Sequence, residues 1–179
     1  IILGNGEKIL ATAAPAGPAF EAASIKCGVR AAAGAIETIK VVDGKLEIGT
    51  IDGAPAIGIC GSGLVDAVAC LVQLGILDAS GKFNEVNDPN LVERDGEKIY
   101  LLTEDVFLSQ RDVRELQFAK AAIATGWALL AEEFGIQDSE IQQVLLAGSF
   151  GSYLSPASAV KIGLVPKISV LRIVSAGNV

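Results

Sequence analysis

Short runs in which apolar and polar residues alternate fill much of the first 51 positions and predict β-hairpins. The runs in each hairpin are separated by an Asn-Gly or Asp-Gly pair, which favours a tight turn because these residues tolerate positive φ. The runs and turns are 1–3, Asn5-Gly6 and 8–14 in the first hairpin, and 36–42, Asp43-Gly44 and 45–51 in the second. The segment 14–26 begins with a Pro/Gly turn and passes into an Ala-rich stretch that is expected to be helical.

A spacing of three to four residues between apolar positions replaces this alternation later in the chain and predicts two helices. The first follows a short apolar strand and begins near Ser62 or Gly63. The second runs over 110–134, with Ser109 as its N-cap. Its apolar stripe consists of Val113, Leu116, Ile123, Trp127, Leu130 and Phe134. Lys120 is the one polar member of that stripe, so the buried face is expected to carry a cation.

The remaining pattern alternates short strands with helices. Residues 78–95 are polar and rich in Asn, Asp and Gly, which predicts an irregular loop. Strands are expected at 98–102, 105–108, 141–148 and 167–174, and a short helix at 155–164. Such an order is typical of an α/β fold with a mixed sheet, hairpins and helices that cover at least one face. With 179 residues, 51% of them hydrophobic, the chain is expected to form a single domain.

Composition and charge remove several classes of function. The net charge is −7 and no segment concentrates Lys or Arg with aromatic residues, so no nucleic-acid partner is expected. No apolar run approaches the roughly 20 residues that span a bilayer, so we expect a cytoplasmic protein with no membrane partner. Cys27, Cys60 and Cys70 lack C-x-x-C spacing and the chain has no histidine, so no metal site is expected.

Three glycine-rich turns stand where strands end or helices begin, and α/β sheets commonly hold ligands at such places. They are Ala16-Gly17-Pro18, Cys60-Gly61-Ser62-Gly63 and Ala147-Gly148-Ser149-Phe150-Gly151. Each lets backbone N–H groups approach an anion with no Cβ in the way. None has the spacing of a P-loop or of a Rossmann fingerprint. Together they outline a phosphate cradle, whereas each of them alone is usually only a turn.

The side chains near these turns leave alternatives open. The 147–151 turn is one residue away from the G-x-S-x-G elbow of serine hydrolases, but the missing histidine excludes the triad. Lys120 either reaches a nucleotide or lays its stem on apolar surface with its ammonium in water. Glu115 either pairs with a ribose hydroxyl or is an exposed helix carboxylate. Glu21 either orients a water near a γ-phosphate or complements a helix N-terminus.

Five longer blocks stand in order along nearly the whole chain. They are "AAPAGPAFEAASI", "GICGSGLVDAVA", "LSQRDVRELQFAKAAIATG", "VLLAGSFGSYLSPASAVKIGLVP" and "VSAGN". In this order they resemble the C-terminal ATPase domain of the reductive activators of corrinoid enzymes. That domain is similar to the acetate and sugar kinase, heat-shock chaperone and actin superfamily. The resemblance therefore implies one actin-like, ribonuclease-H-like lobe.

The resemblance also implies an activity. Family members use ATP and Mg²⁺ to help electrons from an N-terminal ferredoxin-like [2Fe-2S] domain reduce an inactive Co(II) corrinoid protein to Co(I) for methyl transfer. The implied partner is a corrinoid protein or a corrinoid-dependent methyltransferase, and a homodimer is expected. Together with the glycine turns, the resemblance gives these nucleotide contacts: Gly17, Gly61, Ser62, Gly63, Glu115, Lys120, Gly148, Ser149 and Gly151. Glu21 is the catalytic candidate.

The chain departs from the family pattern at several places, and these departures leave other functions open. A "DIGTNGE"-like strand would stand immediately before Ile1, so we expect the chain to be a fragment that binds nucleotide weakly and does not hydrolyse ATP efficiently by itself. The iron-sulfur domain and the first lobe are expected to be absent from it. Ala22 stands where the family usually has glycine. The alternatives are a docking and dimerisation module for a corrinoid protein, and a phosphotransferase lobe of the sugar or acyl kinase kind.

Overall fold

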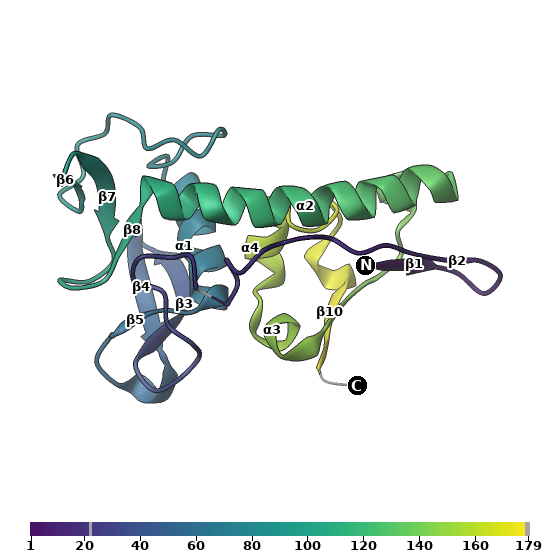
Figure 1. Ribbon diagram of the computed structural model, residues 1–179, viewed down its shortest axis with the longest axis horizontal. Coiled ribbons are helices and arrows are strands. Elements are labelled where there is room, and N and C mark those ends of the chain that lie inside the picture. Colours follow the sequence, from purple (N-terminus) through teal and green to yellow (C-terminus); the bar gives the residue numbers. More distant parts are fainter. Residues whose placement is uncertain (22, 178–179) are drawn as a thin grey trace. The chain divides into compact units, whose positions relative to one another are not determined.

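The computed structural model describes residues 1–21 and 23–177, so Ala22 lies outside the described residues, as does the side chain of Ser149. The chain divides into two compact units, Ile1–Gly17 with Phe118–Val179, and Pro18–Gln117. The long helix α2 (Gln110–Phe134) contributes residues to both (Figure 1). Among the described residues, none of the helices has the length and apolar character that crossing a membrane requires.

A three-stranded mixed sheet lies in the Pro18–Gln117 unit. Its order is β4-β3-β5, with β3 (Ala35–Val42) antiparallel to β4 (Lys45–Thr50) and parallel to β5 (Gly58–Ile59). Asp43 and Gly44 have φ values of 49° and 76°, as a type I′ turn requires, so the predicted hairpin is confirmed. A 3₁₀ turn, η1 (Ile51–Gly53), precedes β5. The helix α1 (Gly61–Gln73) packs on β3, and its residues 61–71 are all buried.

A second sheet in this unit corrects the prediction that 78–95 is irregular throughout. Its antiparallel strands, in spatial order, are β6 (Leu91–Arg94), β7 (Glu97–Leu101) and β8 (Phe107–Ser109). Leu91–Arg94 is a strand because Asp95 and Gly96, both at positive φ, turn the chain back onto β7. The part before Leu91 is a loop, and side chains of α2 hold it by hydrogen bonds to the carbonyls of Ser80 and Gly81.

The start of α2 is fixed by a reciprocal pair of hydrogen bonds, which confirms Ser109 as the N-cap. The Ser109 hydroxyl accepts from the Asp112 amide at 3.2 Å, and the Asp112 carboxylate accepts from the Ser109 amide at 2.8 Å. The other carboxylate oxygen of Asp112 accepts from the Lys26 amide at 2.9 Å. Both Ser109 and Asp112 are fully buried. Asp112 therefore ties the start of α2 to the segment that contains Lys26.

The same bond explains why 14–26 is not the predicted helix. The described residues of this segment form successive turns, with bonds such as that from the Ala23 amide to the Pro18 carbonyl at 3.2 Å. The Lys26 amide donates to Asp112 instead of to a helical carbonyl. Helix propensity from alanine is a weak preference, and this tertiary hydrogen bond overrides it.

We expect Asp112→Asn to lower the free energy of unfolding by about 2 kcal/mol. An amide has one acceptor oxygen, so either the Ser109 or the Lys26 amide would lose its buried partner. Urea denaturation followed by circular dichroism measures the change. The control is Arg111→Gln at an exposed neighbouring side chain, which should change the free energy by about 0.5 kcal/mol or less. Equal midpoints for Asp112→Asn and the control would contradict the role given to Asp112.

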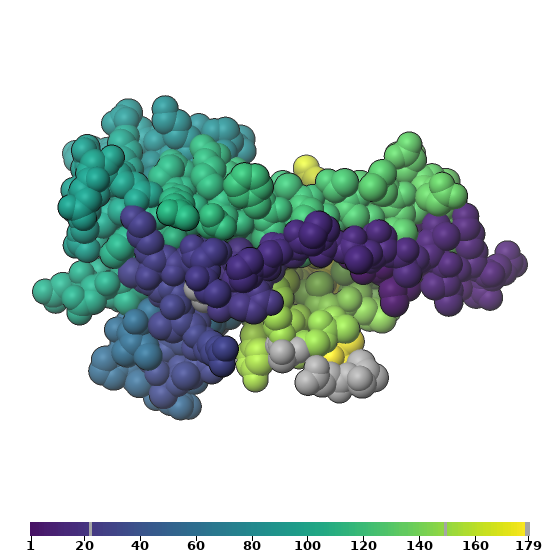
Figure 2. Space-filling model, viewed as in Figure 1, coloured from purple at the N-terminus to yellow at the C-terminus, as the bar shows by residue number. Residues whose placement is uncertain are grey.

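The unit of Ile1–Gly17 and Phe118–Val179 contains two strand pairs. The predicted hairpin is confirmed as β1 (Ile2–Gly4) antiparallel to β2 (Ile9–Ala11), and β9 (Val144–Ala147) pairs in parallel with β10 (Ile173–Gly177). The hairpin segment runs along α2, as the purple and green surfaces in Figure 2 show. A Cβ built on Gly126 of α2 would lie 2.6 Å from Cδ1 of Ile1. The absence of a side chain at Gly126 therefore allows this close packing.

Short helices flank β9 in this unit. They are η2 (Asp138–Glu140) before it, and α3 (Gly148–Tyr153), α4 (Pro156–Lys161) and η3 (Val170–Arg172) after it. α4 lies within the predicted helix 155–164, and Ser155 caps it by accepting from the Ser158 amide at 3.3 Å. The last strand begins at Ile173 and not at 167 as predicted, because Ser169 caps η3 and the strand starts only after that turn. The predicted α/β fold class is confirmed.

Candidate functional site

The turn between β9 and α3 presents bare backbone. Gly148 follows directly on β9 with φ of 85°, a left-handed conformation that strains residues with a Cβ. Among the described residues, no atom lies within 4 Å of a Cβ built on Gly148, so these residues leave the space in front of it open. A Cβ on Gly151 would lie 2.8 Å from the carbonyl carbon of Leu146. Gly148 therefore faces open space, while Gly151 lets α3 pack against β9.

Gly17, in the same unit, shares the features of Gly148. Its φ is 67°, it is exposed, and a Cβ built on it meets no atom of the described chain within 4 Å. An anion can approach the backbone of such a glycine without a steric barrier. Two of the three predicted glycine turns thus expose left-handed backbone that the described residues leave open, and their contact with a phosphate remains a prediction.

Lys120 lies half-buried on α2, as the apolar stripe around it predicts. Its side chain ends beside Gly163, where a built Cβ would lie 3.3 Å from Cε and 3.4 Å from Nζ of Lys120. Gly163 has φ of 71° and directly follows the C-cap of α4. Among the described residues, no hydrogen bond or ion pair engages the ammonium of Lys120. The predicted helix 155–164 wrongly includes Gly163, although a glycine near the end of a helical pattern is a signal that the helix stops there.

The third glycine turn, Gly61-Ser62-Gly63, is buried at the start of α1. The Ser62 hydroxyl donates to the Glu37 carbonyl at 3.0 Å. A Cβ on Gly63 would lie 2.9 Å from the carbonyl carbon of Ile36 and closer still to its oxygen. These residues therefore let α1 pack directly on β3, and their contact with a phosphate remains a prediction.

The two predicted carboxylates differ in exposure. Glu21 is exposed in the turns that replace the expected helix, and Glu115 is half-buried on α2. The segment that carries Glu21 is anchored by Lys26, whose amide donates to Asp112 and whose ammonium pairs with Glu97. The hydrogen bond from Lys26 holds the pKa of Glu97 below its usual value of 4.5 and raises the pKa of Lys26.

We expect the stabilisation from this ion pair to depend on pH. Because the pKa of folded Glu97 is lowered, its contribution is complete above pH 4.5 and is lost as the pH falls through the folded pKa. At pH 7 the urea midpoint of Glu97→Gln should lie below that of the wild type, and the gap should close on acidification. Glu93→Gln, at an exposed carboxylate on β6, is the control. A gap that stays constant from neutral to acidic pH would contradict this account.

The predicted site residues fall in both compact units. Gly17, Lys120, Gly148, Ser149 and Gly151 belong to the unit of Ile1–Gly17 and Phe118–Val179, and Glu21, Gly61, Ser62, Gly63 and Glu115 to Pro18–Gln117. Within the described part of the chain, no group of three or more Cys, Asp or Glu side chains is placed to hold a metal ion.

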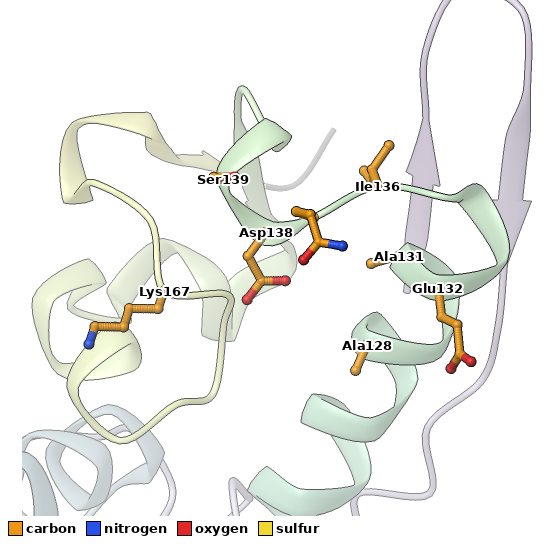
Figure 3. Close-up of a pocket in the computed structure, with 8 residues that line it drawn as sticks. Ala128, Ala131, Glu132, Ile136, Asp138, Ser139 and Lys167 are labelled. Carbon is orange, nitrogen blue, oxygen red and sulfur yellow. The ribbon is translucent and has the colours of Figure 1, made fainter.

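A cavity of about 630 Å³ lies at the end of α2 in the first of these units. Its walls include Glu132 on α2, Asp138 on η2 and Lys167 from the segment before η3 (Figure 3). Ala128, Ala131 and Ile136 add apolar surface. None of the predicted site residues lines this cavity, and charges of both signs share its walls.

Known proteins resemble the chain over almost its full length. It is 34% identical, over 99% of its length, to the corrinoid activation enzyme RamQ of Eubacterium limosum. It is 27% identical, over 97% of its length, to the reductase of the Co(II) methylated amine-specific corrinoid protein of Methanosarcina barkeri. A solved structure of a reductive activator for a corrinoid, iron-sulfur protein covers 99% of the chain with a TM-score of 0.90 and 36% identity.

These relatives are much longer than the chain, which spans 33%, 34% and 30% of their lengths, respectively. A family model described as the C-terminal domain of RACo, the ASKHA domain, matches residues 1–179. The match includes the open turn at Gly148, after β9, and extends over the whole chain. The chain belongs to the family of the C-terminal ASKHA domain of RACo.

Proposed function

We propose that this domain binds ATP for a reductive activator that returns an inactive Co(II) corrinoid protein to Co(I) for methyl transfer. The observation that carries the proposal is the open, left-handed backbone of Gly148 directly after β9, in a chain of the ASKHA family. The names of the relatives support a corrinoid protein as partner. Because the chain spans about a third of those relatives, we assign electron transfer through a [2Fe-2S] cluster to other parts of the whole protein.

In this proposal five residues of one unit hold the nucleotide. Gly148 and Gly17 offer backbone that no described side chain covers. The family resemblance adds Ser149 and Gly151 as contacts to the adenosine. Lys120 offers an ammonium that no described residue engages, and phosphate oxygens are strong partners for such a cation. Bound ATP supplies the free energy that an unfavourable electron transfer requires.

The proposed roles in the Pro18–Gln117 unit are supporting ones. For this unit by itself, the resemblance suggests that Glu21 orients a water near a γ-phosphate and that Glu115 accepts a hydrogen bond from a ribose hydroxyl. Gly61, Ser62 and Gly63 contribute backbone N–H groups at the start of α1, which no side chain caps. Mg²⁺ bound together with ATP would be held chiefly by phosphate oxygens and water, as is usual for this ion in nucleotide sites.

The experiment is an activation assay with the full-length protein, a reductant and the Co(II) corrinoid protein. The absorbance of the Co(I) form should rise when Mg-ATP is added and should stay low without it. Lys120→Met should lower the ATP-dependent rate by about tenfold, because the ammonium is lost while the apolar stem is kept. Co(I) formation at the same rate with and without ATP would contradict the proposal.

A docking and dimerisation module is the second candidate, and two exposed apolar side chains of α2 favour it. Phe118 is 74% exposed and Leu129 is 57% exposed. Exposed apolar side chains of this size mark surfaces for partners when they gather on one face. A docking module predicts that Phe118→Ser abolishes capture of the corrinoid protein, or dimer formation, and leaves ATP binding intact. We place such a homodimer in the cytoplasm, consistent with cysteines that form no disulfide with one another in the described part of the chain.

A further inference from the structure

The loop of the β1–β2 hairpin carries an unusual arrangement around one asparagine. Gly4 pairs with Ile9, so the loop consists of residues 5–8. The side-chain oxygen Oδ1 of Asn5 accepts two hydrogen bonds from backbone amides, from Glu7 at 2.9 Å and from Lys8 at 2.8 Å. The backbone N–H of Asn5 donates to the Lys8 carbonyl at 2.9 Å. The carboxamide of Asn5 is thus polarised by two N–H groups while the residue itself is exposed.

The residue after Asn5 offers an unhindered nucleophile. Gly6 is exposed, and a Cβ built on it would meet no atom within 4 Å. Within the described part of the chain, the Gly6 amide nitrogen donates no hydrogen bond. It is therefore open to solvent, can lose its proton to hydroxide, and has no side chain that blocks its approach to Cγ of Asn5.

We propose that Asn5 is a site of spontaneous deamidation to aspartate and isoaspartate in the folded protein. The Gly6 nitrogen attacks Cγ of Asn5, and the negative charge that develops on Oδ1 is stabilised by the amides of Glu7 and Lys8. The Cγ–Nδ2 bond breaks and ammonia leaves with one added proton, which gives a cyclic imide. Water then opens the imide at either carbonyl. No electrons are exchanged, and water is the only co-reactant.

The other described asparagines lack this arrangement. Asn84 is followed by Glu85, and its side-chain nitrogen donates to the Gly75 carbonyl at 2.8 Å. Asn87 and Asn90 are followed by Asp88 and Leu91, whose side chains hinder the approach of the next backbone nitrogen. The protein therefore contains its own reference sites for the reaction at Asn5.

The reaction would change a contact between the hairpin and α2. The ammonium of Lys8 donates to the Glu133 carbonyl at 3.2 Å and lies 5.2 Å from the centre of the Phe134 ring. Isoaspartate adds a methylene to the backbone of the loop, which displaces the amides of Glu7 and Lys8 from their acceptor. We therefore expect the β1–β2 amides to exchange with deuterium faster in the deamidated protein.

The test is incubation of the purified protein at mildly alkaline pH, with peptide mass spectrometry and enzymatic detection of isoaspartate. Asn5 should convert about tenfold or more faster than Asn87 in the same sample. Gly6→Ala should slow the conversion of Asn5 by about tenfold, and Asn5→Gln should remove the isoaspartate signal. Equal rates at Asn5 and Asn87, or an unchanged rate in Gly6→Ala, would overturn the proposal. So would conversion of Asn5 only after the protein is unfolded in urea.

Discussion

Gly63→Ala is expected to lower the free energy of unfolding by about 3 kcal/mol or more. The added Cβ would meet the carbonyl of Ile36, with its carbon at 2.9 Å, and a strand backbone cannot move aside as a side chain can. The loss exceeds the gain of about 1 kcal/mol that alanine brings to a helix interior. Urea denaturation, or the soluble yield when the variant fails to fold, measures the effect.

Gly126→Ala is the matched control for this variant. It is the same substitution in a helix, and its added Cβ would also meet a close neighbour, Cδ1 of Ile1 at 2.6 Å. That neighbour is the end of a flexible side chain, so it can rotate away. We expect a change within about 1 kcal/mol in either direction. Equal losses for Gly63→Ala and Gly126→Ala would contradict the claim that α1 needs its glycine to pack on β3.

Gly148→Val should weaken the binding of Mg-ATP by about 100-fold, or about 3 kcal/mol. A valine side chain would fill the open space in front of the turn and would strain the left-handed backbone at φ of 85°. Because no described atom lies within 4 Å of the added Cβ, the fold should survive with a loss of about 2 kcal/mol. Equilibrium dialysis of the full-length protein against Mg-ATP measures the affinity.

Gly135→Val is the control that distinguishes backbone strain in Gly148→Val from the loss of a nucleotide contact. Gly135 has a similar φ of 81°, and a Cβ built on it also meets no atom within 4 Å. It lies just after α2 and is not a predicted site residue. Its variant should lose similar stability and keep the affinity for Mg-ATP. If both variants bind ATP as the wild type does, the turn after β9 does not contact the nucleotide.

Much of the local structure could be predicted because local signals agree with the fold. Asp43-Gly44 encodes the type I′ turn, and the pair of Ser109 and Asp112 encodes the start of α2. The prediction for 14–26 failed because a tertiary bond from the Lys26 amide to Asp112 competes with helix formation. Such a bond joins residues far apart in the chain, so no local pattern announces it.

In the candidate site, too, the sequence predicts the local features but not the packing around them. The sequence identifies all three glycine turns, but it treats them alike. The structure separates them, since Gly148 and Gly17 face open space whereas Gly63 is enclosed by the backbone of β3. That difference depends on which strand lies next to each turn, which is a property of the packed fold. The position of Lys120 beside Gly163 is likewise visible only once α2 and α4 are packed.

Isothermal titration of Mg-ATP into the full-length protein tests the central claim most directly. Binding to the ASKHA domain predicts a saturable heat with one site per chain, and the same titration of Gly148→Val should give no measurable heat at equal concentrations. The absence of heat from the wild type, together with a melting temperature that Mg-ATP leaves unchanged, would contradict the claim that this domain binds ATP.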